Sequence, residues 1–246
     1  MTMQRINRQQ MRHFPALPSI AALVGVLTLA GLLVGAAPSF ADDRTDAQQL
    51  VEKARLSFES FTADPNFGVL RDYLKTAKGV YIAPQVLRGA FIFGVSGGSG
   101  VLLARDEKVG TWGGPAFYTI GEASFGLQAG ADAAEVVMLA MTERGVSKLL
   151  STSVKLGGDV SIAAGPVGAG MRGETAGLSA DIVSFARSKG LYAGISFEGA
   201  IVATRDGLNK AYYGKAVTPT DILIRREVSN AQAAPLVRSV TEVAGR

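Results

Sequence analysis

The side chains available for chemistry in this chain are carboxylates, amines, guanidiniums, phenols and hydroxyls. The 246 residues include no cysteine and one histidine, His13. Because His13 lies in an N-terminal segment that we expect to be removed, the mature chain has neither a thiolate nor an imidazole. Ser-His-Asp catalysis, Cys-His catalysis and zinc sites built from cysteine or histidine are therefore excluded. We predict no cofactor and no metal.

Three carboxylates, Glu122, Asp132 and Glu135, are the candidates for acid-base chemistry. Paired carboxylates about 5 to 10 Å apart in a cleft can hydrolyse glycosides. Nothing in the spacing of these three residues requires such a pair, and placement on separate faces of the fold would remove the possibility. A carboxylate-dependent hydrolase is therefore an alternative, and we expect a protein that is not an enzyme.

Basic residues at predicted turns are the candidates for binding an anionic lipid. Each lysine or arginine near an anionic leaflet contributes about 1 kcal/mol. Arg187 and Lys189 are the first choice, because no acidic residue stands within three positions on either side. A solvated hairpin tip is the alternative, since exposed turns are often charged whatever the function. The remaining candidates are Arg88, Arg105 and Lys108, the last two flanking a pair of acidic residues.

Aromatic residues could add a belt at a membrane interface, where their amphipathic rings are favoured. The candidates are Trp112, Phe117 and Tyr192, with Tyr212 and Tyr213 as further possibilities. For most of them burial in the core, with hydrogen-bonded hydroxyl groups, is the favoured interpretation.

The N-terminus has the plan of a secretory signal peptide. Arg5, Arg8 and Arg12 precede an uncharged apolar run, and small residues close it. We predict a signal peptide over residues 1–41, cleaved after Ala41, with Ala37 as the second choice. An uncleaved anchor is the alternative, because residues 20–37 approach the length needed to span a bilayer. Either way, the positive flank places the remainder outside the cytoplasm, in the periplasm or at an envelope membrane.

The mature chain, residues 42–246, is long enough for one domain with a substantial core. Removal of three arginines leaves 22 basic and 21 acidic residues, a net charge of +1. A basic footprint for nucleic acid is therefore not supported.

Helical patterns stand at both ends of the mature chain. Residues 42–63 carry apolar side chains at three- and four-residue steps, with Thr45 and Gln48 spaced as a capping box. A second helix is expected over 67–76, a third over 142–150, and two more begin at Thr218 and Pro235. The polar face of the first helix balances acidic and basic residues, so packing on its own domain is favoured over lying on a membrane.

Between these helices the apolar period changes to two, which predicts strands. We expect short strands over 80–82, 91–95, 101–104, 117–120, 124–130 and 135–141, and a charged hairpin tip over 105–110. Two glycine-bearing strands are expected within 157–177, further strands over 179–185 and 191–204, and a turn over 209–213. The predicted class is α+β: an antiparallel, barrel-like sheet of many short strands with packed N- and C-terminal helices.

Several segments together resemble a known family. They are AKGVYIAP at 77–84, WGGPAF at 112–117, GLQAGAD at 126–132, SFARSKGLYAGISFEG at 184–199 and YYG at 212–214. In order and spacing they are similar to the SYLF domain, and the likeness covers about residues 46–224. The resemblance implies a lipid-binding module, with phosphoinositide binding and, in some fungal members, actin binding.

For an exported bacterial protein the implied ligand becomes another anionic lipid, such as phosphatidylglycerol, cardiolipin or lipopolysaccharide. We therefore expect a non-catalytic domain that binds anionic phospholipid or a membrane surface through its basic turns, its N-terminal amphipathic helix, or both. A protein-binding scaffold or adhesin of the envelope is a further alternative, and a large exposed apolar patch without nearby basic residues would favour it.

Overall fold

The computed structural model describes residues 40–90, 93–125, 130–168, 179–188 and 197–245. The chain divides into two compact units, Met1–Pro38 and Ser39–Arg246, and the described residues belong to the second. The predicted signal peptide lies almost wholly outside them and stays a prediction. No helix in the described ranges is both long and apolar enough to cross a membrane.

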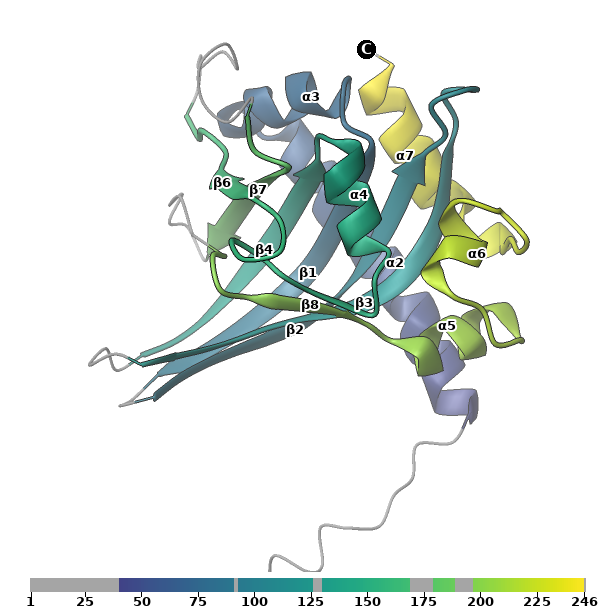
Figure 1. Cartoon of the computed structure of the whole chain (residues 1–246), viewed down its shortest axis with the longest axis horizontal. Helices are drawn as coiled ribbons and strands as arrows, with labels where there is room; N and C mark the ends of the chain where they lie inside the picture. The colour runs from purple at the N-terminus through teal and green to yellow at the C-terminus, as the bar shows by residue number, and fades with distance from the viewer. Residues whose placement is uncertain (1–39, 91–92, 126–129, 169–178, 189–196, 246) are drawn as a thin grey trace, which may run out of the picture. The chain divides into compact units, whose positions relative to one another are not determined.

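An eight-stranded sheet forms the centre of the second unit and curls toward the side that holds α4 (Glu143–Leu149) (Figure 1). Its order is β5-β8-β3-β2-β1-β4-β7-β6, and every neighbouring pair is antiparallel except β6 with β7. This confirms the predicted α+β class. The strands are β1 (Gly79–Ala90), β2 (Phe93–Arg105), β3 (Trp112–Phe125), β4 (Gly130–Ala140), β5 (Ser153–Lys155), β6 (Ile162–Ala164), β7 (Ile182–Ser188) and β8 (Ile201–Thr204).

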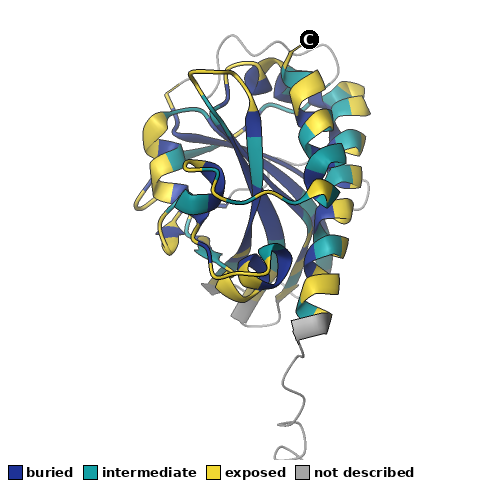
Figure 2. Ribbon diagram, turned by 90° about the vertical axis from the view of Figure 1, so that its right-hand side faces the viewer, coloured by how far each residue is buried: buried dark blue, intermediate teal, exposed yellow. Residues whose placement is uncertain are grey.

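One face of the sheet, here called the helical face, is covered by the N- and C-terminal helices. They are α2 (Phe40–Ala63), α3 (Gly68–Leu74) after the short 3-10 turn Pro65–Phe67, and α7 (Ala234–Ala244) after the turn Ala231–Ala233. The predicted apolar stripe of α2 is confirmed, since Val51, Phe58 and Phe61 are fully buried with Phe185 of β7. In Figure 2 the buried residues lie on the strands and on the inward sides of the helices.

The opposite, concave face holds a second core. Here α4, α6 (Pro219–Leu223) and β5 with β8 pack over alternate residues of the central strands, such as Tyr81, Tyr118 and Met138. The Tyr118 hydroxyl donates to the Leu149 carbonyl at 2.7 Å, which ties the end of α4 to β3. Thr218 caps α6 through a full capping box with Asp221, and Pro219 stands in its first turn, as predicted.

Several predicted breaks in the strands were wrong. The first strand was expected to stop before Pro84, but β1 continues to Ala90 with a shift of register between Ile82 and Val86. A bulge tolerates proline, because the ladder needs no N–H there. The expected pairs over 91–104 and 117–130 are likewise the single strands β2 and β3, as far as the described residues extend.

Other boundaries also need correction. Residues 209–213, expected as a turn, form most of helix α5 (Asp206–Tyr213), which ends at Gly214 in the left-handed conformation. Helix α2 already begins at Phe40, so Thr45 lies inside it and is no cap. Of the strands expected within 157–177 and 191–204, the described parts are β6 and β8; residues 169–178 and 189–196 lie outside the described ranges.

Strands β1 to β4 run on beyond both cores at one end (Figure 1). We call the segments 85–90, 93–98, 121–125 and 130–133 the extension. On its helical face Leu87 and Val95 are 56% and 65% exposed. Their register neighbours on that face are the glycines and alanines Gly89, Gly97, Gly121, Ala123 and Ala133. The described residues of this surface therefore carry no charged side chain.

Gly114 is a position where the fold needs a glycine. Its φ of 125° lies where side chains are rarely tolerated, and an added Cβ would stand 2.9 Å from a Leu223 methyl group and 3.0 Å from the Leu102 carbonyl. The missing side chain lets α6 pack closely on the start of β3. The strand and α6 would have to move apart for any larger residue.

We therefore expect Gly114→Ala to lower the free energy of unfolding by about 2 to 3 kcal/mol, measured by urea denaturation. Gly207→Ala is the matched control. It lies in α5 with no atom within 4 Å of the added Cβ, so it should be neutral or slightly stabilising. Equal effects of the two changes would contradict the close-packing explanation.

Candidate functional site

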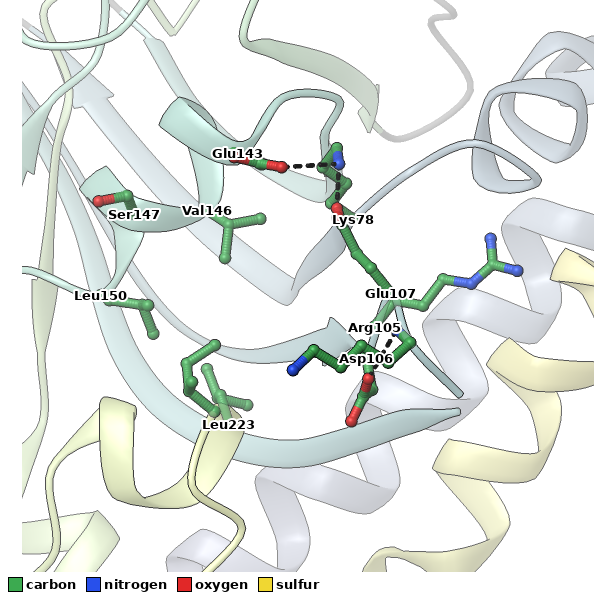
Figure 3. A pocket seen from close by; sticks show the side chains of 11 residues that line it. Lys78, Arg105, Asp106, Glu107, Glu143, Val146, Ser147, Leu150 and Leu223 are labelled. Carbon is green, nitrogen blue, oxygen red and sulfur yellow. Dashed lines mark hydrogen bonds and ion pairs between the residues drawn. The ribbon is translucent and has the colours of Figure 1, made fainter. Parts of the chain in front are cut away.

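A cavity of about 490 Å³ opens on the concave side, between α4, the end of α6 and the turn that joins β2 to β3 (Figure 3). It has the size of a small-molecule site. Apolar side chains from α4 and α6 lie beside charged side chains from the turn. The lining residues are Lys78, Arg105, Asp106, Glu107, Lys108, Glu143, Val146, Ser147, Leu150, Leu223 and Ile224.

Lys78 is held at the cavity wall by the ends of three strands. Its backbone N–H donates to the Ala140 carbonyl at 2.8 Å, and its carbonyl accepts from the Arg105 N–H at 2.8 Å. The ammonium group forms an ion pair with Glu107 and lies 3.7 Å from the Glu143 carboxylate, as Figure 3 shows. Its charge is thus neutralised by two carboxylates of the same wall.

The turn after β2 places a second lysine at the rim. The Asp106 carboxylate accepts from the backbone N–H groups of Lys108 and Val109 at 2.9 and 3.3 Å, and Gly110 has a φ of 75°. Asp106 thereby shapes the turn, as aspartates commonly do. The exposed Lys108 ammonium makes no hydrogen bond or ion pair within the described ranges, although Asp106 and Glu107 precede it in the same turn.

The other side of this turn is held by Arg226. Its guanidinium donates to the hydroxyl and the carbonyl of Thr111 at 2.8 and 2.9 Å, and lies 4.0 Å from the Asp106 carboxylate. Arg226 has a φ of 55°, which is uncommon for a residue other than glycine. It connects the segment after α6 to the turn after β2, so two opposite walls of the cavity are fixed to each other.

Helix α4 supplies the apolar wall and is positioned by Asp181. The Thr142 hydroxyl caps α4 at the Gly145 N–H and donates to the Asp181 carboxylate at 2.6 Å. The other carboxylate oxygen accepts from the hydroxyl and the backbone N–H of Ser161 at 2.8 and 3.1 Å. The hydrogen bond from Thr142, then those from Ser161, lower the pKa of Asp181.

The basic residues predicted from sequence are not brought together. Arg105 and Lys108 lie at the cavity, whereas Arg88 lies in the extension above the Phe197 ring at 5.2 Å. Arg187 was placed in a turn but belongs to β7, and it faces the helical side. Lys189 lies outside the described residues.

The Arg187 guanidinium is engaged within the fold. It is paired with Glu135, donates to the Ser60 hydroxyl at 2.9 Å and lies 4.8 Å from the Phe61 ring centre. These contacts fasten the C-terminal half of α2 to the sheet. Binding of a lipid phosphate by Arg187 would compete with them.

The aromatic candidates lie mostly inside the domain. Trp112 and Phe117 are 5% and 0% exposed in the core of the helical face. The hydroxyl groups of Tyr212 and Tyr213 donate to Gln232 and to the Pro115 carbonyl at 2.6 and 2.7 Å. Contact of these rings with a membrane would require their exposure, and Tyr192 lies outside the described residues.

The three candidate carboxylates are also separated. Glu122 and Asp132 lie on β3 and β4 with two strands between them, roughly 14 Å apart at the usual strand spacing. Glu135 faces the helical side, where it pairs with Arg187. No group of three histidine, cysteine, aspartate or glutamate residues in the described part could hold a metal ion.

Sequence reasoning missed most of the cavity. Lys78 stands in the AKGVYIAP segment, directly before β1. Nothing in that segment indicates that its ammonium group pairs with Glu107 and Glu143. Val146 in α4 and Ile224 at the end of α6 are 78 residues apart in the chain. The signal that did find this site was charge at a turn, through Arg105 and Lys108.

Comparison with known proteins identifies the family of this chain. Residues 121–243 match the model of the Ysc84 family, described as "Las17-binding protein actin regulator". The chain belongs to this family, the SYLF family. Among its relatives, Protein YSC84 of Saccharomyces cerevisiae is 36% identical over 170 residues, covering 67% of this chain and 36% of the relative. SH3 domain-containing YSC84-like protein 1 of Homo sapiens is 31% identical over 162 residues, 65% and 47% of the two chains.

The SYLF chain described here spans about a third to a half of the length of these relatives. The shared part includes the cavity's α4 and α6 within the matched residues 121–243. The description of the family refers to binding and regulation.

The SYLF fold should lose stability in acid through Asp181. A carboxylate whose pKa is lowered by folding stabilises the native state above its unfolded pKa, near 4, and this contribution disappears as the pH falls through the folded pKa. We expect Asp181→Asn to cost about 2 kcal/mol at pH 7 and to flatten the decline in unfolding free energy below about pH 4.

Asp72→Asn is the control for this prediction, because Asp72 is exposed and pairs with Lys75 on the surface at the end of α3. It should stay within about 0.5 kcal/mol of the wild type at pH 7. An Asp181→Asn variant with the wild-type decline in acid would show that Asp181 does not contribute to it.

Proposed function

We propose that this SYLF domain binds an anionic lipid at the cavity between α4, α6 and the 106–110 turn. The observation that carries the proposal is the pairing of an apolar wall, Val146, Leu150 and Ile224, with a rim lysine, Lys108, that has no acidic partner among the described residues. An amphiphile needs both parts, since its chain gains from apolar burial and its phosphate from the cation.

The cavity is preferred over the N-terminal helix as the binding element. The apolar stripe of α2 is buried in the domain's own core, so lying on a membrane would require α2 to leave the sheet. The wall of the cavity, in contrast, is already open, and Ile224 is 52% exposed. The proposed ligand is a phospholipid of an envelope membrane, in keeping with the predicted signal peptide.

The proposal supposes binding without turnover. The separation of Glu122, Asp132 and Glu135 leaves no carboxylate pair among them at the distance that glycoside hydrolysis needs. The cavity does contain Glu107 and Glu143, but both face Lys78, which keeps them as acceptors in ion pairs.

Sedimentation with vesicles of graded phosphatidylglycerol content tests the proposal. We expect binding at low salt that rises with anionic content, and a loss of about 2 kcal/mol, roughly thirtyfold in affinity, for Lys108→Glu. Ile224→Asp should weaken binding as well, since it places a charge in the apolar wall.

Lys215→Glu is the matched control. It makes the same change of charge at an exposed residue outside the cavity and should leave binding within about threefold of the wild type. The proposal fails if the protein stays in the supernatant at every anionic content, or if Lys108→Glu and Lys215→Glu act alike.

A second function, docking of a protein, is favoured by the helical face of the extension. Leu87 and Val95 are exposed there among glycines and alanines, and the described residues of this face carry no charged side chain. Uncharged apolar patches of this kind often mark protein contacts. The description of the matching family as an actin regulator makes actin the first partner to test.

Cosedimentation with actin filaments separates the two functions. If the extension docks on actin, the double change Leu87→Asp and Val95→Asp should abolish cosedimentation while vesicle binding remains, because neither residue lines the cavity. Lys108→Glu should show the opposite pattern. Wild-type cosedimentation by the double variant, or none by the wild type, would rule out actin docking at this face.

A further inference from the structure

Arg88 stands in a row of polar residues that crosses the concave face of the extension. The strand register pairs Arg88 of β1 with Ser96 of β2 and Asp132 of β4, and pairs Ser96 with Glu122 of β3. Direct partners in an antiparallel sheet project to the same face. Arg88 lies ten residues beyond Lys78 along the chain, roughly 30 Å at the rise of a strand, so this row is separate from the cavity.

The guanidinium of Arg88 has an edge without partners. Its Nε and Nη2 atoms are buried and make no hydrogen bond within the described part of the chain. These two nitrogens lie on the same side of the planar group, and their N–H bonds point in parallel. That edge matches the two oxygens of a carboxylate or a phosphate, which accept from arginine in pairs.

The carboxylate across the strand pair has hydrogen-bond donors of its own. Asp132, the cross-strand neighbour of Arg88, accepts from the Ser188 hydroxyl at 2.5 Å and from the Ala133 N–H at 2.7 Å. The Phe197 ring lies 5.2 Å from the guanidinium carbon and covers one of its faces. Arg88 is thus oriented by an aromatic ring and by its strand, while its chelating edge makes no hydrogen bond among the described residues.

An unsatisfied charged donor that is shielded from water is costly, by more than the 1 to 3 kcal/mol typical of a neutral group. A bound oxyanion would remove this cost. The Ser96 hydroxyl, next to Arg88 across the strand pair, also makes no hydrogen bond among the described residues and supplies a third donor. Arg88, Ser96, Glu122 and Asp132 are half-buried as whole residues, while the Nε and Nη2 atoms of Arg88 are shielded from water.

We propose that Arg88, with Ser96, forms a binding site for an oxyanion, a carboxylate or phosphate group, on the concave face of the extension. The parallel N–H bonds of Nε and Nη2 hold two oxygens of the group, and the Ser96 hydroxyl donates to it. Glu122 lies on the far side of Ser96 and opposes a second negative charge, which limits the site to groups of low charge.

The test observes the Arg88 Nε–H resonance of the 15N-labelled protein during titration with sodium phosphate, sodium acetate and phosphatidylglycerol vesicles at constant ionic strength. A saturable shift with phosphate or acetate indicates a free small anion, and a shift with vesicles alone indicates a lipid headgroup. The proposal is overturned if the resonance stays unmoved in all three titrations.

Variants then separate chelation from charge. Arg88→Lys keeps the positive charge but loses the parallel pair, and we expect at least tenfold weaker binding of the anion that shifts the wild type. Glu122→Gln should tighten binding a few-fold, which a purely structural Arg88 would not produce. Arg55→Lys is the control, because that guanidinium donates to Glu52 and Glu59 on α2, outside both this row and the cavity. Wild-type affinity in a folded Arg88→Lys variant, checked by circular dichroism, would contradict the proposal.

Discussion

Strands β1 to β4 must serve two cores at once, because alternate residues of each strand face opposite sides of the sheet. Along half of their length both sides are covered: Val80 and Ile82 pack under α2 and α7, while Tyr81 packs under α4 and α6. Beyond Pro84 the same strands continue without cover on the helical face. This unequal covering gives the domain a closed half, which bears the cavity at its end, and an open half, which presents bare sheet.

The sheet depends on small residues where elements approach one another. A side chain at Gly100 would stand 2.6 Å from the Tyr81 ring, and one at Gly98 would meet the Gln85 carbonyl at the bulge of β1. Gly114 admits Leu223 in the same manner. At Gly98 and Gly100 the glycine pattern of β2 is therefore explained by packing between strands.

The sequence predicted the periodic elements well and the continuity of the sheet poorly. The stripe of α2 and the cap of α6 are local patterns that survive in the fold, whereas the cap expected at Thr45 does not. Strand β3 passes unbroken through Gly121 because its ladder with β2 and β8 is set by distant residues. The charged turn at the cavity was visible as a motif. The partners of each charge were not, since Arg187 finds Glu135 only once β4 and β7 pair.

Charge pairing is what distinguishes the basic residues of this domain from one another. Arg187 and Lys78 have the same formal charge as Arg88 and Lys108, but each is neutralised by acidic side chains on adjoining elements. An incoming anion at Arg187 would displace Glu135 and loosen α2, so any attraction there is offset by lost structure. At Lys108 no such exchange is needed, and at Arg88 the anion would complete hydrogen bonds that the fold leaves open. We therefore expect anions to bind where a cation has no ion-pair partner within the described fold. Lys108 and Arg88 meet this condition at the two ends of the sheet, away from the middle, where α2 is fastened.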